Sequence, residues 1–175
     1  MKKLIVLCVF LSFSLFADAQ IKRNFDGLVL GKTSREEVVS NLRSKSLFPK
    51  DADGGKAVRA VGKIAFAGVV WDVVKYFFIN DKLYKILYIK YYDDRPVDYI
   101  NLDEAYLKIR NGLLKKYTNQ KSPSSGVKVP NNLFLKSKDT TVEIEKRCEQ
   151  RNYLRLRYTD INLNRQSKQK DYDEL

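Results

Sequence analysis

The chain has 175 residues, with 33 Lys and Arg against 21 Asp and Glu, a formal net charge of +12 and no histidine. The absence of histidine excludes Ser-His-Asp and Cys-His catalysis and a histidine-ligated zinc site. The two cysteines, Cys8 and Cys148, are too few for a thiolate metal site, so we expect no metal and no cofactor. The length fits one domain that can bury a core without disulfide bonds.

The N-terminus has the pattern of a secretory signal. Lysines precede an apolar run at 4–16, and Ala17 and Ala19 are the small residues that a signal peptidase recognises. The run is shorter than the roughly 20 apolar residues that span a bilayer. We therefore expect residues 1–19 to be a signal peptide cleaved after Ala19, leaving a secreted or periplasmic protein of formal charge +11 without a transmembrane segment. Lipoprotein cleavage at Cys8 is the weaker alternative.

Residues 25–34, "FDGLVLGKTS", resemble the phosphate-binding loop of nucleotide hydrolases at first sight. That loop needs four residues between its first glycine and the Gly-Lys-Thr, so that successive backbone amides can wrap the phosphates. Only three residues separate Gly27 from Gly31, and Asp26 occupies the position of the first glycine. The spacing and the carboxylate both argue against a nucleotide site.

The same segment instead predicts a turn into a helix over 34–46. Thr33 and Ser34 are each followed three residues later by a glutamate, at Glu36 and Glu37, which is a doubled capping box. Apolar residues then recur at helical spacing.

The next part of the chain is the most strand-like. Valine, isoleucine, tyrosine and phenylalanine dominate it, and turn signals divide it at Ala67-Gly68 and Asn80-Asp81. These features predict a three-stranded antiparallel meander at 58–66, 69–79 and 82–92.

A two-residue turn at Asn80-Asp81 assigns the side chains of the last two strands to two faces. We expect the first face to enter the core with Phe78, Val74, Val70, Leu83, Leu87 and Tyr91. The second face then carries an aromatic and basic set: Trp71, Lys75, Phe77, Lys82, Tyr84, Tyr88 and Lys90. A register slip of one residue would exchange the faces of one strand.

A second helix is predicted after the meander, and three further strands follow it. Apolar residues at helical spacing mark the helix, at Leu102, Tyr106, Ile109, Leu113 and Tyr117. The strands are expected near 133–138, 140–148 and 153–159, where apolar residues alternate with glutamates and arginines. Cys148 is expected to be a small buried side chain. Residues 162–175 are polar and are expected to form a loose C-terminal tail.

The order of the elements is thus a helix and three strands, twice. It predicts an α+β fold in one domain, residues 20–161, with a first repeat at about 25–93 and a second at about 101–160. In this duplicated arrangement, two helices pack on one face of a shared antiparallel sheet.

Short motifs give a resemblance to known families. The "GKTSREEV" entry into the first helix, together with the order of elements, resembles the β-lactamase-inhibitor-protein-like and BamE-like (SmpA/OmlA) modules. The chain is also similar to a broad set of signal-peptide-bearing bacterial proteins that share Phe25, Gly27 and Gly31 at the entry and Gly62, Phe66 and Gly68 in a hairpin. The resemblance implies a module that binds other proteins through exposed sheet or loop surfaces. It identifies no target, because no inhibitor-specific residue can be matched.

A single layer of helices leaves one face of the sheet without cover. The aromatic and basic set has the composition of protein interfaces, so we expect a non-enzymatic module that binds a partner protein through it. A second copy of the chain, the long loop or the tail are other possible covers. The net charge and the lysine and arginine clusters, including one at 165–170, favour the alternative of a basic envelope protein that binds acidic glycan or lipopolysaccharide.

Two other functions are weaker predictions. Specific nucleic-acid binding lacks a recognisable motif. Glycosidases use a pair of carboxylates, and pairs such as Asp51 with Asp53 or Glu143 with Glu145 match them only in residue type. Solvated turns account for the first pair, and cross-strand pairing with arginines accounts for the second.

Overall fold

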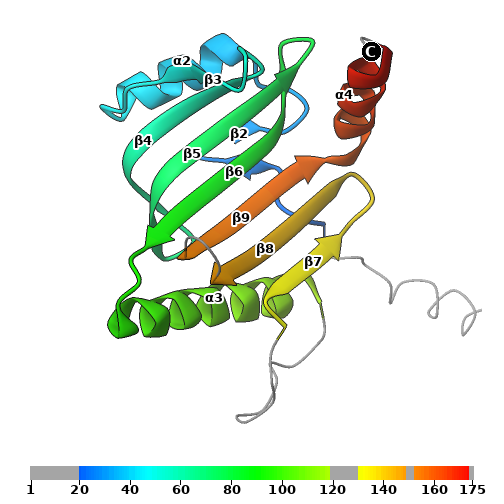
Figure 1. Ribbon diagram of the computed structural model, residues 1–175. Coiled ribbons are helices and arrows are strands. Elements are labelled where there is room, and N and C mark those ends of the chain that lie inside the picture. The colour runs from blue at the N-terminus through cyan, green and yellow to red at the C-terminus, as the bar shows by residue number, and fades with distance from the viewer. Residues whose placement is uncertain (1–19, 119–129, 149–151, 174–175) are drawn as a thin grey trace, which may run out of the picture.

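The computed structural model describes residues 20–118, 130–148 and 152–173, and it has an α+β fold (Figure 1). A large antiparallel sheet is built from β3 (Lys50–Ala52), β4 (Ala57–Phe66), β5 (Val69–Ile79), β6 (Lys82–Tyr92), β7 (Asn132–Lys136), β8 (Thr140–Cys148) and β9 (Asn152–Asp160). The strand order is β3-β4-β5-β6-β9-β8-β7. The strands before helix α3 (Pro96–Tyr117), which are β3–β6, and those after it, β7–β9, therefore join through β6 and β9. The predicted α+β class with a shared antiparallel sheet is confirmed.

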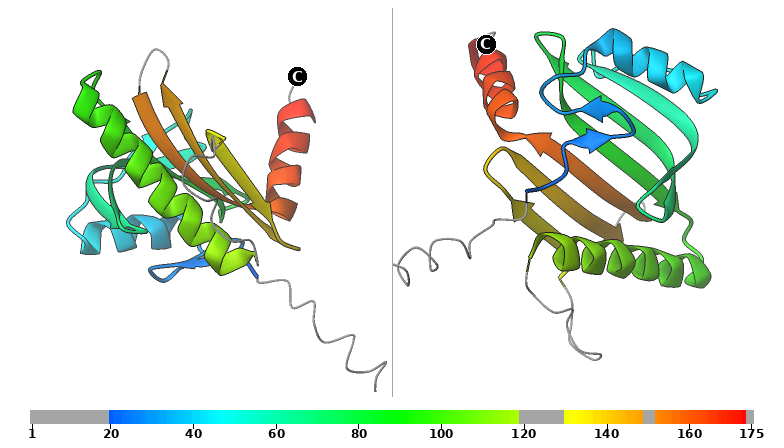
Figure 2. Two further views of the ribbon diagram at one scale, coloured as in Figure 1. Left: turned by 90° about the horizontal axis from the view of Figure 1, so that it is seen from below. Right: turned by 180° about the vertical axis from the view of Figure 1, so that it is seen from behind.

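The helices divide between the two faces of this sheet. Helices α2 (Arg35–Ser44) and α3 (Pro96–Tyr117) lie on one face, together with a small hairpin of β1 (Asn24–Phe25) and β2 (Leu28–Val29) (Figure 2). Helix α4 (Ile161–Asp173) lies on the opposite face. We call the face that carries α4 the open face, because α4 crosses only one end of it.

The entry into α2 follows the predicted capping box. Ser34 is the N-cap and accepts a hydrogen bond from the backbone amide of Glu37, whose side chain accepts one from the amide of Ser34. The preceding turn pairs with β6, since the amide of Gly31 donates to the carbonyl of Leu83 at 2.7 Å. Gly31 has a φ of 82°, and a Cβ there would lie 2.7 Å from the Arg23 guanidinium. The Gly-Lys-Thr sequence is therefore a structural turn.

The core lies between the sheet and the layer formed by α2, α3 and the β1–β2 hairpin. Aromatic side chains form its centre: the Phe66 and Tyr88 rings stack with centroids 4.5 Å apart, and Phe25 lies 4.6 Å from Tyr158. Helix α3 contributes apolar residues at the predicted helical spacing, which are Leu102, Tyr106, Ile109 and Leu113. The segments predicted at 69–79, 82–92 and 140–148 coincide with β5, β6 and β8.

Two predictions near the C-terminus are wrong. Residues 162–173 are not a loose tail, because they belong to α4, whose first turn is capped by Asp160. Cys148 is exposed and unpaired rather than buried, since it lies at the end of β8, where the alternation of buried residues stops after Ile144. The short strands β1, β2 and β3 were not predicted.

Part of the predicted organisation lies outside the described residues. This applies to the signal peptide at 1–19, to most of the loop that joins α3 to β7, and to residues 174–175. Within the described ranges, none of the helices combines the length and the apolar character needed to cross a bilayer.

Burial gives several tyrosines unusual pKa values. Burial, with a smaller contribution from Asp26, raises the pKa of Tyr76 well above the ordinary value of about 10. Burial also raises the pKa of Tyr88 and of Tyr158, and burial with Asp72 raises that of Tyr92 to about 12. Since these values are raised in the fold, the stability that they contribute is complete below pH 10 and is lost as the pH rises through the folded pKa values.

We therefore expect the native protein to ionise fewer of its eleven tyrosines near pH 10 than the unfolded chain does. The four tyrosines with the raised pKa values given above should ionise only at higher pH, together with loss of the fold. Ultraviolet difference absorbance measures tyrosinate formation, circular dichroism follows the fold, and the chain in urea is the control. Ionisation of all eleven near pH 10 with the fold intact would contradict the burial of these side chains.

Candidate functional site

The open face of the sheet carries a mixture of charged and apolar side chains. One row of residues in cross-strand register runs across it from β4 to β7, namely Arg59, Lys75, Leu87, Arg157, Glu143 and Phe134. Residues directly opposite each other in antiparallel strands point to the same face, so this row defines the composition of the surface. The neighbouring row adds Val61 and Val73, and Val61 is 55% exposed.

Helix α4 and the sheet enclose a groove of about 530 Å³ at one end of the open face. We call it the cationic groove, because five of the side chains that line it are basic: Lys85, Lys136, Arg157, Arg165 and Lys168. Glu143 is the one acidic residue among its lining, and Phe134 is its most exposed apolar residue at 57%. The strands position one wall and α4 positions the other.

The positive charge of the groove is neutralised only in part. Arg157 forms an ion pair with Glu143. Lys136, Arg165 and Lys168 make no ion pair with any residue that the structure describes. Burial lowers the pKa of Lys85, and the positive charge of Arg157 lowers it further. An anionic group in the groove would relieve this repulsion.

Helix α4 is held over the open face by polar contacts. The Asp160 carboxylate accepts a hydrogen bond from the amide of Leu163 at 2.9 Å, which caps the first turn. The Ser167 hydroxyl donates to the Tyr84 hydroxyl at 3.3 Å, and Tyr84 is only 7% exposed. The groove is thus built on packed elements.

Two residues of the predicted binding set lie in the core instead of on a surface. Trp71 is 0% exposed and Tyr88 is 4% exposed, with their ring centroids 5.6 Å apart. The Trp71 indole donates to the backbone carbonyl of Phe66 at 2.9 Å. The prediction that both belong to an exposed face is wrong.

A β-bulge explains the exchange of faces in β6. The two-residue turn is present, because Ile79 pairs with Lys82, but Phe77 pairs with Lys85 and leaves Tyr84 as an extra residue. Beyond the bulge, every β6 residue is shifted by one place relative to the predicted register. Tyr88 therefore enters the core. A second bulge, in β4 between Val61 and Ile64, lies opposite the part of β5 that contains Trp71.

The other five predicted residues are dispersed. Lys75 and Phe77 are on the open face, where Lys75 binds Asp53 at 3.0 Å. Tyr84 packs against α4, and Lys82 is exposed at the β5–β6 turn. Lys90 pairs across the sheet with the core residue Leu154 and lies 3.6 Å from Asp72, so it belongs to the other face.

The sequence contained a partial signal for the groove. The sequence shows the basic cluster at 165–170, but its polar character predicts a loose tail, whereas the structure places the cluster on α4 above the sheet. The alternation in its strand predicts Arg157 as the cross-strand partner of a glutamate, and it gives no sign that Arg157 also lines a groove. The carboxylates of the described residues form no group suited to a metal ion.

Comparison with known proteins does not assign the chain to a family. No family model matches the chain, and no curated protein or solved structure is significantly similar to it.

Proposed function

We propose that the protein is a secreted or periplasmic, non-enzymatic binding module, and that its cationic groove and the adjoining open face hold an acidic partner protein. The observation that carries this proposal is the concentration of five basic side chains around one glutamate, beside an exposed phenylalanine. Arginine and aromatic residues are enriched at protein interfaces. Opposite charge on the partner supplies orientation and a faster encounter.

The apolar part of the open face favours a protein over an acidic polymer. Phe134 and Val61 are more than half exposed, and Leu87 lies between them in the sheet. An acidic glycan or lipopolysaccharide would use the charges but would gain little from these side chains. Binding of such a polymer is the alternative function.

The arrangement of the strands supports the proposal that the domain is duplicated. Each half supplies a helix followed by strands, and the halves meet through β6 and β9. The resemblance to β-lactamase-inhibitor-protein-like and BamE-like modules stays part of the proposal, and it agrees in kind with a sheet surface that binds proteins.

Reversing two charges of the groove is expected to weaken binding of the partner protein. Arg165→Glu with Lys168→Glu changes exposed residues of α4 and should weaken binding by about tenfold or more, because each 1.4 kcal/mol of lost interaction is tenfold. The chain, residues 20–175, is crosslinked to an envelope extract of the source organism, and the captured proteins are identified. Calorimetry then measures the affinity of the wild type and of each variant for the purified partner.

The matched control is Lys32→Glu with Lys115→Glu, which makes the same change in net charge outside the groove. A defined acidic protein that binds the wild type and the control but not the groove variant would support the proposal. Equal weakening of both variants, together with binding to heparin that salt abolishes, would replace it with the polyanion function. Equal capture by all three proteins would refute a role for the groove.

A further inference from the structure

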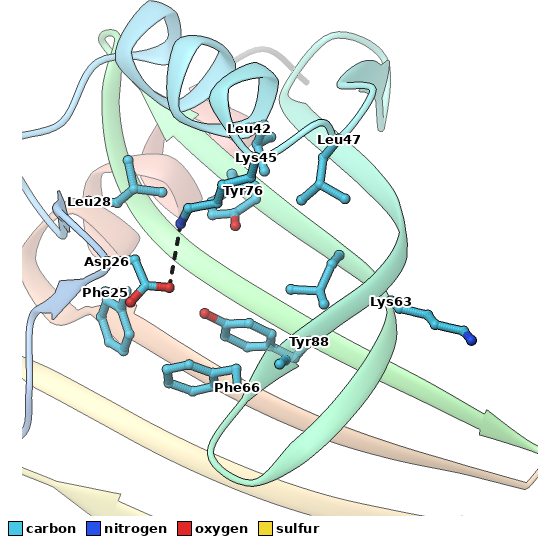
Figure 3. Close-up of a pocket in the computed structure, with 12 residues that line it drawn as sticks. Phe25, Asp26, Leu28, Leu42, Lys45, Leu47, Lys63, Phe66, Tyr76 and Tyr88 are labelled. Carbon is cyan, nitrogen blue, oxygen red and sulfur yellow. Dashed lines mark hydrogen bonds and ion pairs between the residues drawn. The ribbon is translucent and has the colours of Figure 1, made fainter.

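A second hollow lies on the other side of the sheet, under α2 and the β1–β2 hairpin. Its volume is about 180 Å³. Figure 3 shows the side chains around it, with Leu42 and Leu47 above, Phe25 and Phe66 below, and the phenol rings of Tyr76 and Tyr88 between them. It is therefore separated by the sheet from the cationic groove and independent of the function proposed for that groove.

Two hydroxyl groups face this cavity without a protein partner. Tyr76 is 6% exposed and Tyr88 is 4% exposed, and their oxygens point into the space that the labelled residues surround (Figure 3). Neither hydroxyl forms a hydrogen bond with any residue in the described part of the chain, and neither oxygen is among the fully enclosed polar atoms that lack a partner, so both reach the open space of the cavity. A hydroxyl that reaches the cavity without a protein partner can hydrogen-bond to solvent or to a molecule bound there. These two hydroxyls are thus available to a bound molecule.

The remaining walls are mainly apolar. Leu28, Leu42, Leu47, Ile64 and Phe66 contribute hydrocarbon surface. The mouth is polar, because Lys45 and Asp26 approach each other at 3.5 Å across it, while the Lys63 side chain points away (Figure 3). Apolar walls with a few convergent polar groups are the usual composition of a small-molecule site.

We propose that this cavity is a binding site for a small, neutral, largely apolar molecule that carries one hydroxyl or carbonyl group, which Tyr76 and Tyr88 hold by hydrogen bonds. The size is suitable, because an apolar cavity of about 150 Å³ is large enough for benzene. The ligand is neutral because Asp26 and Lys45 already compensate each other's charge and a further buried charge would be unpaired. Burial keeps the pKa of both tyrosines above the ordinary value, so both hydroxyls stay protonated and able to donate.

Phenol and toluene form a matched pair of probes, since they have nearly the same shape and differ by a hydroxyl in place of a methyl group. Phenol is expected to bind saturably with a dissociation constant of about 1 mM or lower, and toluene at least about threefold more weakly, as one hydrogen bond allows. The measurement is a titration of the chain, residues 20–175, that follows the methyl resonances of Leu28, Leu42, Leu47 and Ile64.

Variants connect the binding to the cavity. Tyr76→Phe with Tyr88→Phe removes the hydroxyls and keeps the rings, so the thermal midpoint should be unchanged or higher and the preference for phenol over toluene should be lost. Leu47→Trp fills the half-buried edge of the cavity and should weaken both probes by about tenfold or more.

Three results would overturn the proposal. The first is the absence of saturable phenol binding up to about 10 mM, ten times the expected constant, with the methyl resonances unshifted. The second is equal affinity of the wild type for phenol and toluene, which needs no variant to interpret. The third is unchanged phenol binding by a folded Leu47→Trp protein, which would place the probe elsewhere.

Discussion

Replacing Trp71 by alanine is expected to lower the free energy of unfolding by about 3–5 kcal/mol, the usual range for truncating a buried large aromatic residue. The side chain is 0% exposed, contacts the Tyr88 ring and donates to the Phe66 carbonyl. The variant therefore loses apolar burial, leaves a cavity and leaves a carbonyl without its donor. Urea unfolding followed by far-ultraviolet circular dichroism measures the loss.

Val70→Ala is the matched control, because Val70 is adjacent in β5 and is 46% exposed. It should cost less than about 1 kcal/mol, as substitutions of exposed residues usually do. A loss below 1 kcal/mol for Trp71→Ala would show that the indole is at the surface, as its sequence pattern had suggested. The result also matters for function, since an alanine variant at Trp71 would lose binding through unfolding and could not test an interface.

Replacing Asp160 by alanine is expected to cost about 3 kcal/mol, near the lower limit for breaking a buried ion pair. The Asp160 side chain is 6% exposed and binds Arg23, which is 25% exposed, so solvent reduces the loss. The other carboxylate oxygen caps α4 through the Leu163 amide. One carboxylate thus connects the N-terminal segment, β9 and α4, and its removal should also increase amide exchange in α4.

Asp160→Asn separates these two roles, because asparagine is also a good N-cap. It should lose the charge interaction with Arg23 but keep the protection of the α4 amides. Urea unfolding measures the global stability, and hydrogen exchange measures α4. Equal loss of α4 protection in the alanine and asparagine variants would show that the ion pair, rather than the cap, holds the helix.

Local features of the fold were predictable from the sequence. Ser34 and Glu37 identify the start of α2, and Asn80-Asp81 identifies the β5–β6 turn, because each signal depends on hydrogen bonds or backbone angles within a few residues. The alternation of apolar and polar residues likewise predicts the correct bounds of β8. Such signals need no knowledge of distant parts of the chain.

The candidate sites depended on features that the sequence does not encode locally. The extra residue at Tyr84 exchanges the faces of β6, and nothing in the turn sequence marks it. Helix α4 is polar along its length, so its order depends on the Asp160 cap and on contacts with the sheet that sequence periodicity cannot reveal. The groove and the cavity both follow from these two features.

We expect the central β6–β9 ladder to form late in folding. Its partners are 60 residues apart at Tyr92 and Asn152 and 74 residues apart at Lys85 and Thr159, whereas the hairpins β4–β5, β5–β6 and β8–β9 join neighbouring segments. Closing a long loop costs conformational entropy before the strand contacts can stabilise it. Strand pairs that are distant in sequence therefore form slowly. We therefore expect β4–β6 on one side and β8–β9 on the other to pair quickly, and the pairing of β6 with β9 to limit the rate at which the single core is completed.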